Sequence, residues 1–466
     1  MRQSATRWLV PSASLEAAAA ERERAAGADG LAPIPVRDAF ERLLAPVAAN
    51  PEAHRLVPLD VRRAAFDSYE QSVAPGGKPG RDWKHDYARA AAEIPWDERP
   101  EGPASAARPE PLVPHDAVAA FARPAFSPLR VASNAGHADG RQVNYVRQIV
   151  SEADRALFAR SFGSAVRWGD DKFASLAVAC MQDGLLIHVP AGVRLDGPIL
   201  IETRVAGTLG FSFPYVLVVL DDGAEATVIE DLSGAGFSCG IVEAIVGDHA
   251  RLDYVAVQRA GSASTILMNR GAVCAADATC RFFVAEVGAA LSRSVIATRL
   301  AGKGSSAEIT GFFFNAGDQH VDLSSLVEHA VGPTASRTTI KSAATGRGQG
   351  RYLGNIRIDA HANGSDATLR DDALLLSKRA HIDSVPALEI ASNDVKAFHG
   401  ATVGSIDEDE LFYAQTRGIE RSEAERMIAL GFFEPLVAAF PAEGLRAFLR
   451  STLAEKAGGS SPAESA

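Results

Sequence analysis

The chain has 466 residues, of which 47% are hydrophobic and 23% charged, so it is long enough to bury a large core without disulfides or structural metals. Its formal net charge of -11 argues against a general affinity for nucleic acid or anionic membranes. The apolar run at residues 8–10 is too short for a secretory signal, and the longest β-rich apolar run, residues 215–220, is far below the roughly 20 residues that span a bilayer. These features predict a cytoplasmic protein with neither nucleic acid nor membrane as a partner.

Residues 1–165 are predicted to form a mostly helical arm with a proline-rich linker. Apolar residues recur at helical spacing within 14–26, 36–48 and 58–72. Sixteen of the 24 prolines lie in this arm, and the stretch 95–114 combines several of them with almost no periodic hydrophobicity. We therefore expect three helices and an extended connection before the next domain begins.

Residues 166–398 are predicted to form a β domain, because short β-branched and apolar runs alternate there with Gly, Asp and Asn. A small residue recurs before successive strands at intervals of 26, 28, 28, 29 and 30 residues. Such a period indicates stacked units, each unable to cover its apolar face alone. With two or three strands per unit and no helical signal, a β-helix or β-solenoid is favoured, and a β-sandwich is the alternative. The recurring residues are Ala224, Ala250, Ala278, Ser306, Ala335 and Ser365.

Helical periodicity returns near the carboxyl terminus and predicts a helical domain over 399–456, followed by a disordered tail over 457–466. Two capping-box patterns mark the starts of its first two helices, and a glycine between them is typical of a helix end. The capping pairs are Asp407 with Glu410 and Ser422 with Glu425, Ser405 is an alternative cap for the first helix, and the glycine is Gly418.

The four cysteines include no CxxC pair and no cluster that matches a zinc or ferredoxin site, so we expect buried thiols in β-structure rather than cluster ligands. The sequence AGKGSS around Lys303 lacks the GxxxxGK[ST] spacing, so a phosphate-binding loop is not expected there. The cysteines are Cys180, Cys239, Cys274 and Cys280.

His399 is the candidate metal ligand. It lies where the β pattern stops, in DVKAFHGATVG, and Gly400 and Gly404 allow close backbone approach. A neutral imidazole is a competent ligand for iron, and loops at the end of a rigid scaffold often carry function. One histidine without clustered partners is weak support for a metal site, so a structural role stays open at this point.

The segment 386–436, PALEIASNDVKAFHGATVGSIDEDELFYAQTRGIERSEAERMIALGFFEPL, closely resembles the SufB/SufD family of iron-sulfur cluster assembly proteins. The shared signature is a P-x-L-E-I strand, a D-V segment, an H-G-A-T-x-G or H-E-A-T turn, L-F-Y and R-G-I. Residues 173–202 and RDWKHDY at 81–87 also look like this family. SufB-type chains typically carry a cysteine two residues before the histidine and then H-E-A-T, whereas this chain has Ala397 and Gly400 and so resembles the SufD type.

This resemblance implies a mainly β fold, with a right-handed parallel β-helix core between an N-terminal helical region and a C-terminal helical domain. It implies a non-enzymatic scaffold subunit that pairs with SufB and docks the SufC ATPase, with His399 near a nascent iron-sulfur cluster shared with SufB and no cofactor bound by this chain alone. An exposed sheet edge also allows a homodimer. The residues implied to face SufC are Phe412, Tyr413, Arg417, Gly418 and Ile419.

Two other functions compete with this interpretation. A polysaccharide-active β-helix enzyme would use the adjacent acids Asp371 and Asp372, with Arg370 beside them. A SufB-type scaffold would hold the cluster itself, and Ala397 argues against it because alanine offers no donor to iron. Flavin binding, a theme of the assembled complex in this family, has no recognisable motif here.

Overall fold

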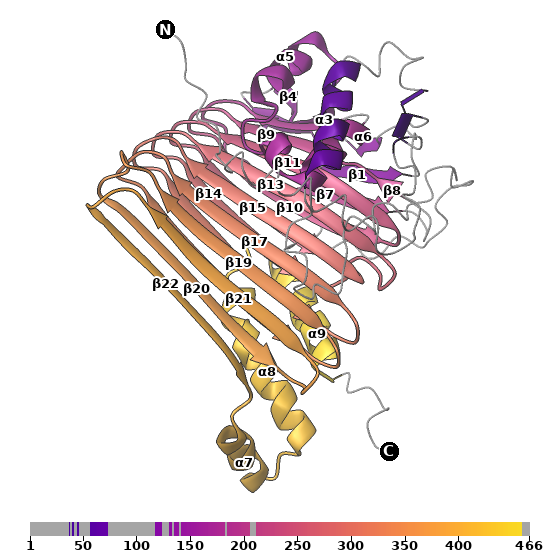
Figure 1. The fold of residues 1–466 in the computed structure, drawn as a ribbon. Coiled ribbons are helices and arrows are strands. Elements are labelled where there is room, and N and C mark those ends of the chain that lie inside the picture. Colours follow the sequence, from indigo (N-terminus) through magenta and orange to yellow (C-terminus); the bar gives the residue numbers. More distant parts are fainter. Residues whose placement is uncertain are drawn as a thin grey trace.

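The computed structural model describes residues 37, 40–41, 44–45, 56–72, 117–123, 130–132, 135–138, 141–181, 184–205 and 211–458. Two long, mostly parallel sheets lie face to face and the chain crosses from one to the other at every turn, which makes a parallel β-solenoid (Figure 1). This confirms the mainly β, stacked-repeat prediction over the sandwich, because neighbouring strands of each sheet come from successive repeats. Within the described residues, no helix has both the length and the apolar character that a bilayer crossing requires.

We call the two layers sheet 1 and sheet 2. In spatial order, sheet 1 contains β2 (Arg130–Ala132), β1 (Ala117–Arg123), β7 (Ile199–Val205), β10 (Glu225–Gly234), β12 (Arg251–Gln258), β14 (Thr279–Glu286), β16 (Ser306–Asn315), β18 (Ala335–Ala344), β20 (Ser365–Leu375) and β22 (Val395–Ser405). Sheet 2 contains β21 (His381–Ile390), β19 (Gln349–Ile358), β17 (His320–His329), β15 (Leu291–Leu300), β13 (Thr265–Cys274), β11 (Phe237–Val246), β9 (Tyr215–Leu220), β6 (Leu185–Val189) and β5 (Val146–Gln148), and β8 (Phe211–Ser212) pairs with β11. β3 (Ala135–Ala138) and β4 (Arg141–Asn144) form a separate antiparallel pair.

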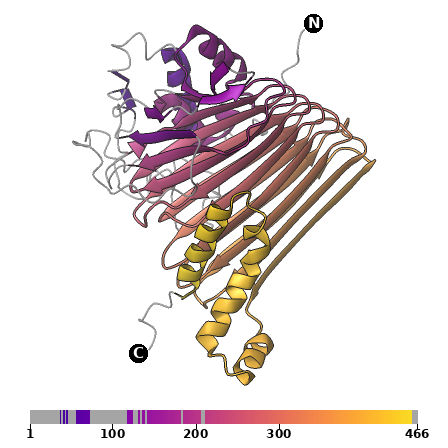
Figure 2. The same cartoon turned by 180° about the vertical axis from the view of Figure 1, so that it is seen from behind.

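Helices cover one outer face of each sheet. The N-terminal helices are α3 (Leu59–Gln71), α5 (Glu152–Ser161), the 3-10 helix η1 (Trp168–Asp170) and α6 (Lys172–Cys180). The C-terminal helices are α7 (Glu408–Thr416), α8 (Arg421–Val437) and α9 (Glu443–Gly458). In Figure 2, which views the molecule from behind, α8 and α9 lie in front of sheet 1, while α3, α5 and α6 gather at the N-terminal end of the solenoid.

Three apolar cores hold these layers together. The largest fills the space between the two sheets, and Val228, Ile296 and Ile340 are among its fully buried members. A second joins the outer face of sheet 2 to α3 and α6, and a third joins the outer face of sheet 1 to α8 and α9. Each strand between two cores is apolar on both sides, which explains runs such as residues 215–220 where simple alternation is missing.

The repeat has a local cause at its turns. Gly223, Gly304 and Gly364 each take a positive φ, and the buried small residue that opens the next strand follows directly. His249 and Asp277 hold the same left-handed conformation in two other turns, with φ of 58° and 55°. A residue in this conformation reverses the chain tightly, and the small residue after it packs under the turn.

Two of the six predicted repeat positions were wrong by one residue. The buried residues are Ser305 and Thr334, whereas Ser306 is half-buried and Ala335 is exposed. The backbone bond from Ala335 N to Ser305 O, at 3.1 Å, matches the one from Thr279 N to Ala250 O, at 2.9 Å, and so places Ser305 in line with Ala250.

The N-terminal helix predicted at 58–72 is confirmed as α3, and the described residues within 36–48 are helical. The helix predicted at 14–26, the linker at 95–114, RDWKHDY at 81–87 and the last residues of the tail lie outside the described residues. The elements do not change at the expected domain boundaries. Helix α6 lies after residue 166, within the expected β domain, and strand β22 continues past residue 399 to Ser405, within the expected helical domain.

Candidate functional site

The last two strands leave one end of the solenoid uncovered. In the described structure β22 pairs with β20 alone and β21 pairs with β19 alone, so each has a free edge. Apolar side chains are exposed on these strands, including Phe398 at 59% and Val403 at 47%. Figure 1 shows the pair at the far end from the N-terminal helices. We call β21 and β22 the open end, and a free edge with apolar side chains is a surface suited to pairing with another chain.

His399 lies in the middle of β22, not in the turn that the sequence predicted. Its register partner on β20 is Leu369, a residue of the core between the sheets. Because register partners on neighbouring strands share a face, His399 points to the interior side of the solenoid. It is exposed only because no described strand stacks on the open end, and no described side chain forms a hydrogen bond or ion pair with its ring. The imidazole is therefore available to whatever covers this end.

Ala397 lies two residues before His399 on the same strand and so on the same interior face. Its register partner Ala367 is buried in the core. A thiol at this position would lie beside the imidazole, which is the arrangement that the SufB-type sequence pattern implies. This chain presents a methyl group there instead.

Asp371 is a buried carboxyl group just inside the open end. It lies opposite Ala401 in register, and Ser384 of β21 donates a hydrogen bond to its Oδ2 atom. Its Oδ1 atom has no hydrogen-bond partner in the described structure. Burial raises the pKa of Asp371 to about 7. The neighbouring Tyr352 hydroxyl bonds Ser325 at 2.6 Å, so the interior is polar close to this end.

Asp371 and Asp372 do not form a catalytic pair. Consecutive strand residues point to opposite faces, and Asp372 lies on the outer face, where Thr402 donates to it at 2.7 Å and Arg370 approaches it at 3.3 Å. A glycosidase needs both carboxyl groups on either side of one bond of the same substrate. The two acids that the sequence offered for sugar chemistry therefore cannot act together.

Metal ligands do not gather elsewhere in the described part of the chain, where no group of three or more His, Cys, Asp or Glu side chains is arranged to hold a metal ion. The four cysteines are free, buried and distant in sequence from the open end. Cys180 ends helix α6, which corrects its prediction as a strand residue. Burial raises the pKa of the Cys180 and Cys239 thiols, so neither is a ready thiolate ligand.

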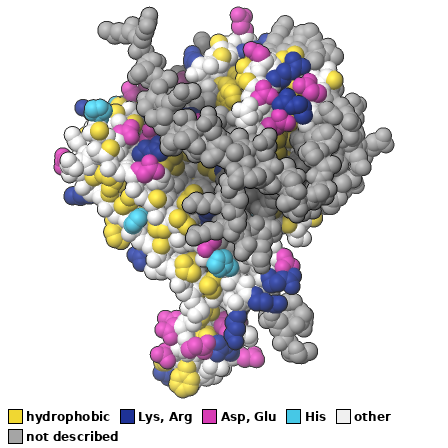
Figure 3. Space-filling view, in the orientation of Figure 1, with side chains coloured by type: hydrophobic (Ala, Val, Ile, Leu, Met, Phe, Trp, Pro, Cys, Tyr) yellow, Lys and Arg dark blue, Asp and Glu magenta, His cyan; other side chains and the backbone are white. Residues whose placement is uncertain are grey.

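The five residues predicted to face SufC lie together on a second surface. We call α7 and the turn into α8, residues 408–421, the foot; it projects beyond the sheets in Figure 1. Phe412 is 68% exposed, and the Arg417 guanidinium lies 5.1 Å from the centre of the Tyr413 ring. In Figure 3 the foot combines acidic, basic and apolar side chains on its surface. Such a mixed patch is typical of a protein interface rather than of a core.

Local sequence explains the shape of the foot. The Asp407 side chain accepts a hydrogen bond from Asp409 N at 2.8 Å and caps α7, as predicted. Gly418 has a φ of 84° and ends the helix, and Ile419 N returns to Ala414 O at 3.2 Å. The second predicted cap was wrong: α8 begins at Arg421, its N-cap residue Glu420 makes no side-chain cap, and Ser422 is inside the helix.

The foot is mounted on sheet 1 and continuous with β22. Phe433 of α8 lies 5.3 Å from the Phe312 ring, and Phe440 lies 5.6 Å from the Phe283 ring. Lys456 of α9 donates to Phe314 O at 2.7 Å. Strand β22 ends at Ser405 and α7 begins at Glu408, so the foot follows directly on the strand that carries His399.

Fold and surfaces together define a class of protein: a parallel β-solenoid with one open end, an available imidazole on that end, and a helical foot joined to the same strand. Comparison with known proteins identifies the family. Residues 203–432 match the model for the SufBD core domain of the SUF system of FeS cluster assembly, so this part of the chain is a SufBD core domain.

Similar proteins carry names that agree with this family. The chain is 29% identical over 262 residues to an iron-sulfur cluster assembly SufBD family protein of Mycobacterium leprae (strain TN), which covers 55% of this chain and 30% of that protein. It is 26% identical over 292 residues to the iron-sulfur cluster assembly protein SufB of Bacillus subtilis (strain 168), which covers 62% of this chain and 63% of that protein. The matches thus span less than two thirds of these relatives. Because relatives named SufB and relatives named only for the family both match, the family does not separate SufB from SufD.

Proposed function

We propose that this chain is a SufD-like, non-enzymatic scaffold subunit of a cytoplasmic iron-sulfur cluster assembly complex. In this proposal the open end pairs with a SufB-type paralogue, and the foot docks the SufC ATPase through Phe412, Tyr413, Arg417, Gly418 and Ile419. The observation that carries it is the position of His399: an available imidazole on the interior face of a free edge strand, with Ala397 where a thiol would stand.

The donor set supports a shared cluster over one held by this chain alone. Iron in a nascent cluster is bound mainly by thiolates, and the cysteines of this chain are buried within helix α6 and strands β11, β13 and β14. A partner strand stacked on β22 would bring its own donors next to His399. His399 is then one ligand, or the group that orders the interface, and the partner supplies the sulfur.

The covalent continuity of β22 and α7 supports the role assigned to the foot. No phosphate-binding loop was found in the sequence, so the energy for rearrangement comes in this proposal from the docked ATPase. Movement of the foot is passed through residues 405–408 to the edge strand, which couples ATP hydrolysis in SufC to the geometry around His399.

Pairing at the open end is tested by co-expression of the chain with its SufB-type paralogue and SufC, followed by affinity purification. Val403→Lys places a charge at the free edge and should remove the paralogue from the purified complex while SufC is retained, because the foot is a separate surface. Val150→Lys is the matched control, since Val150 is 57% exposed but precedes α5 at the other end of the solenoid. Substituting Phe412 and Tyr413 together by Ala should have the opposite result: the paralogue is retained and SufC is lost. Loss of both partners in every variant, or of neither, contradicts the proposal.

The role of His399 is tested in the same complex. His399→Ala should leave assembly of the three subunits intact and reduce the iron and sulfide content after anaerobic reconstitution. His249→Asn, which changes another exposed histidine in the turn before β12 and so several strands from the open end, is the control. Unchanged cluster content in His399→Ala would remove the histidine from the site, and iron and sulfide retained by the isolated chain would favour a SufB-type scaffold instead.

A further inference from the structure

The two free edges of the open end differ in the backbone groups that they offer to another chain. In a parallel sheet, the N–H and C=O groups of one residue point to the same neighbouring strand, and those of the next residue point to the neighbour on the other side. The residues of β21 and β22 that face outward therefore follow from the bonds that each strand makes to the strand before it.

On β21 the odd-numbered residues bond to β19. The N–H groups of His381 and, just past the strand, of Ala391 donate at 3.1 and 2.8 Å to carbonyl oxygens at the two ends of β19. The even-numbered residues within 382–390 therefore point their backbone groups to the free edge. Pro386 lies in the middle of this row and has no N–H group, so the edge lacks its central donor.

The position of this proline is exceptional. Among the strands of the described structure, only β21 contains a proline. At an odd-numbered position it would remove a hydrogen bond to β19, whereas at 386 it removes only a donor that would face outward. Proline on an edge strand is one means by which proteins prevent the addition of another strand. Pro386 therefore blocks the edge of β21 without a cost to the sheet behind it.

Strand β22 has no such gap. The Asp366 N–H donates to Thr334 O at 3.0 Å, so residues of β20 with outward side chains bond to the strand before. Lys396 is the register partner of Asp366 and continues this pattern on β22. The alternate residues then point their backbone groups to the free edge, and none of them is proline. This complete row, with His399 near its centre, consists of residues 395, 397, 399, 401, 403 and 405.

The side chains of the two strands differ in the same direction. On β21 the acids Asp383 and Glu389 have side chains that are 47% and 52% exposed. On β22 the exposed side chains include the apolar Phe398 and Val403, and Lys396 is the one Lys, Arg, Asp or Glu residue of the strand. Charged residues discourage strand addition at an edge, and exposed apolar residues favour it.

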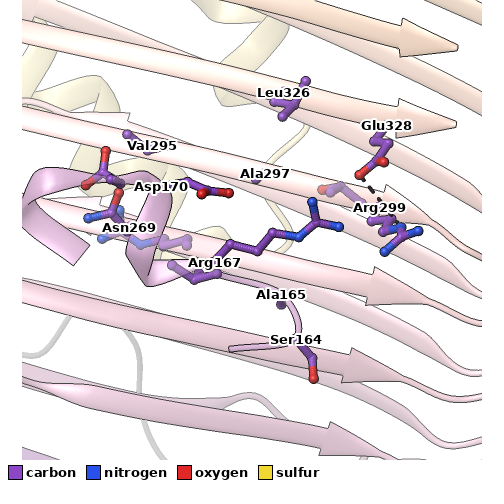
Figure 4. A pocket seen from close by; sticks show the side chains of 14 residues that line it. Ser164, Ala165, Arg167, Asp170, Asn269, Val295, Ala297, Arg299, Leu326 and Glu328 are labelled. Carbon is purple, nitrogen blue, oxygen red and sulfur yellow. Dashed lines mark ion pairs between the residues drawn. The ribbon is translucent and has the colours of Figure 1, made fainter. Parts of the chain in front are cut away.

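A pocket on the outer face of sheet 2 offers no comparable edge. It has a volume of about 230 Å³ and lies between residues 164–171 and strands β13, β15 and β17 (Figure 4). These three strands are paired on both sides. Arg299 in the lining already approaches Glu328 at 3.7 Å. The pocket therefore does not compete with the open end for a partner strand.

We propose that the open end accepts main-chain pairing on β22 and excludes it on β21, so that the SufB-type paralogue adds its edge strand to β22 alone. The identity of this partner rests on the proposed function. The added strand would hydrogen-bond to the row that includes Ala397, His399 and Ala401. It would lie about 4.8 Å from β22, which places the side chains of the partner strand next to the imidazole of His399.

The test measures the affinity of the full-length chain for the paralogue by calorimetry. Ala401→Pro removes an outward N–H group from β22 and places a ring at the free edge, and it should weaken binding by about tenfold or more. Leu388→Pro makes the matched change on β21 and should weaken binding by less than about threefold. Neither variant removes a backbone bond within the chain, and an unchanged affinity for SufC confirms that each one folds. Val403→Pro, with the same backbone orientation, replaces Ala401→Pro if that variant does not fold.

Hydrogen exchange of the wild-type complex tests the same point without a substitution. The paralogue should slow exchange in residues 395–405 much more than in residues 381–390. A larger loss of affinity in Leu388→Pro than in Ala401→Pro, or equal protection of the two strands, would overturn this inference and leave the proposed pairing intact. Failure of the wild-type chain to bind the paralogue would contradict the proposed function itself, and this inference with it.

Discussion

The two ends of the solenoid are built from the same repeat and finished in different ways. At the N-terminal end, β5 adds antiparallel to β6 and β2 adds antiparallel to β1, so the parallel stacking stops, and α3 and α6 cover the neighbouring strands. At the other end β21 and β22 keep the parallel register and have nothing beyond them among the described residues. One end is closed by strands that cannot extend the repeat, and the other remains competent to continue it. The contrast identifies the open end as the place where another chain adds its strands.

The buried polar groups between the sheets also differ between the closed half and the open end. Deep between the sheets, Glu230 and Arg270 form an ion pair at 2.8 Å with both side chains 1% exposed, and Ser294 accepts a further bond from Arg270 at 2.9 Å. Near the open end, Asp371 has Ser384 as its one hydrogen-bond partner among the described residues. A buried polar network in which the groups are hydrogen-bonded is characteristic of a region that is complete within one chain. A buried carboxyl group with an oxygen that lacks a hydrogen-bond partner indicates a region that another chain completes.

The largest effect should come from breaking the deep ion pair. Glu230→Gln removes the carboxylate that pairs with the buried Arg270 and leaves Glu286 as its remaining counter-charge, so it should lower the free energy of unfolding by about 3–5 kcal/mol. Chemical denaturation of the isolated chain measures it. The double variant Glu230→Leu with Arg270→Met removes both charges and should recover most of the loss. A single substitution that costs under about 1 kcal/mol would show that the closed half does not depend on this network.

Asp371 should make the open end sensitive to pH. Its folded pKa of about 7 lies above the ordinary value near 3.9, so the folded chain holds the proton more tightly than the unfolded chain. The stabilisation from this proton is complete below about pH 4 and is lost as pH rises to about 7, a change on the order of 4 kcal/mol. Asp371→Asn stays neutral and should be more stable than wild type at pH 8 and similar to it near pH 4.

Thermal and denaturant unfolding across this pH range measure the effect of Asp371. Asp372→Asn, on the outer face of the same strand, is the control and should not reproduce the gain at high pH. If the difference in stability between the wild type and Asp371→Asn did not change with pH, the carboxyl group would have to reach solvent or a partner at the open end.

Sequence reasoning succeeded where the signal is local and periodic. The repeat predicted stacked strands, and Gly418 predicted the end of α7, because each depends on a turn conformation that few residues adopt. It failed by one residue at Ser305 and Thr334, where two adjacent small or polar residues match the pattern equally well. The left-handed Gly304 directly before Ser305 is the signal that would have resolved the first.

The placement of His399 shows why an edge strand is hard to recognise. Gly400 and Gly404 resemble loop residues, and exposure on both faces of β22 removes the alternation that identifies a strand in a closed sheet. The pocket between residues 164–171 and strands β13, β15 and β17 had no local signal at all, because its two sides meet only when the segment with η1 packs on sheet 2. Register and long-range packing, not propensity, decide both features.

The smallest effect should come from the ion pair at the surface of the open half. Arg370 approaches Asp372 at 3.3 Å, but its side chain is 66% exposed, and Thr402 already donates to Asp372 at 2.7 Å. Arg370→Ala should therefore change the free energy of unfolding by less than about 1 kcal/mol. Denaturation in parallel with Glu230→Gln measures the difference directly. If Arg370→Ala lowers the free energy of unfolding as much as Glu230→Gln does, then Asp372 depends on the guanidinium group. The ion pair on the outer face of β20 would then contribute as much to stability as the deep ion pair.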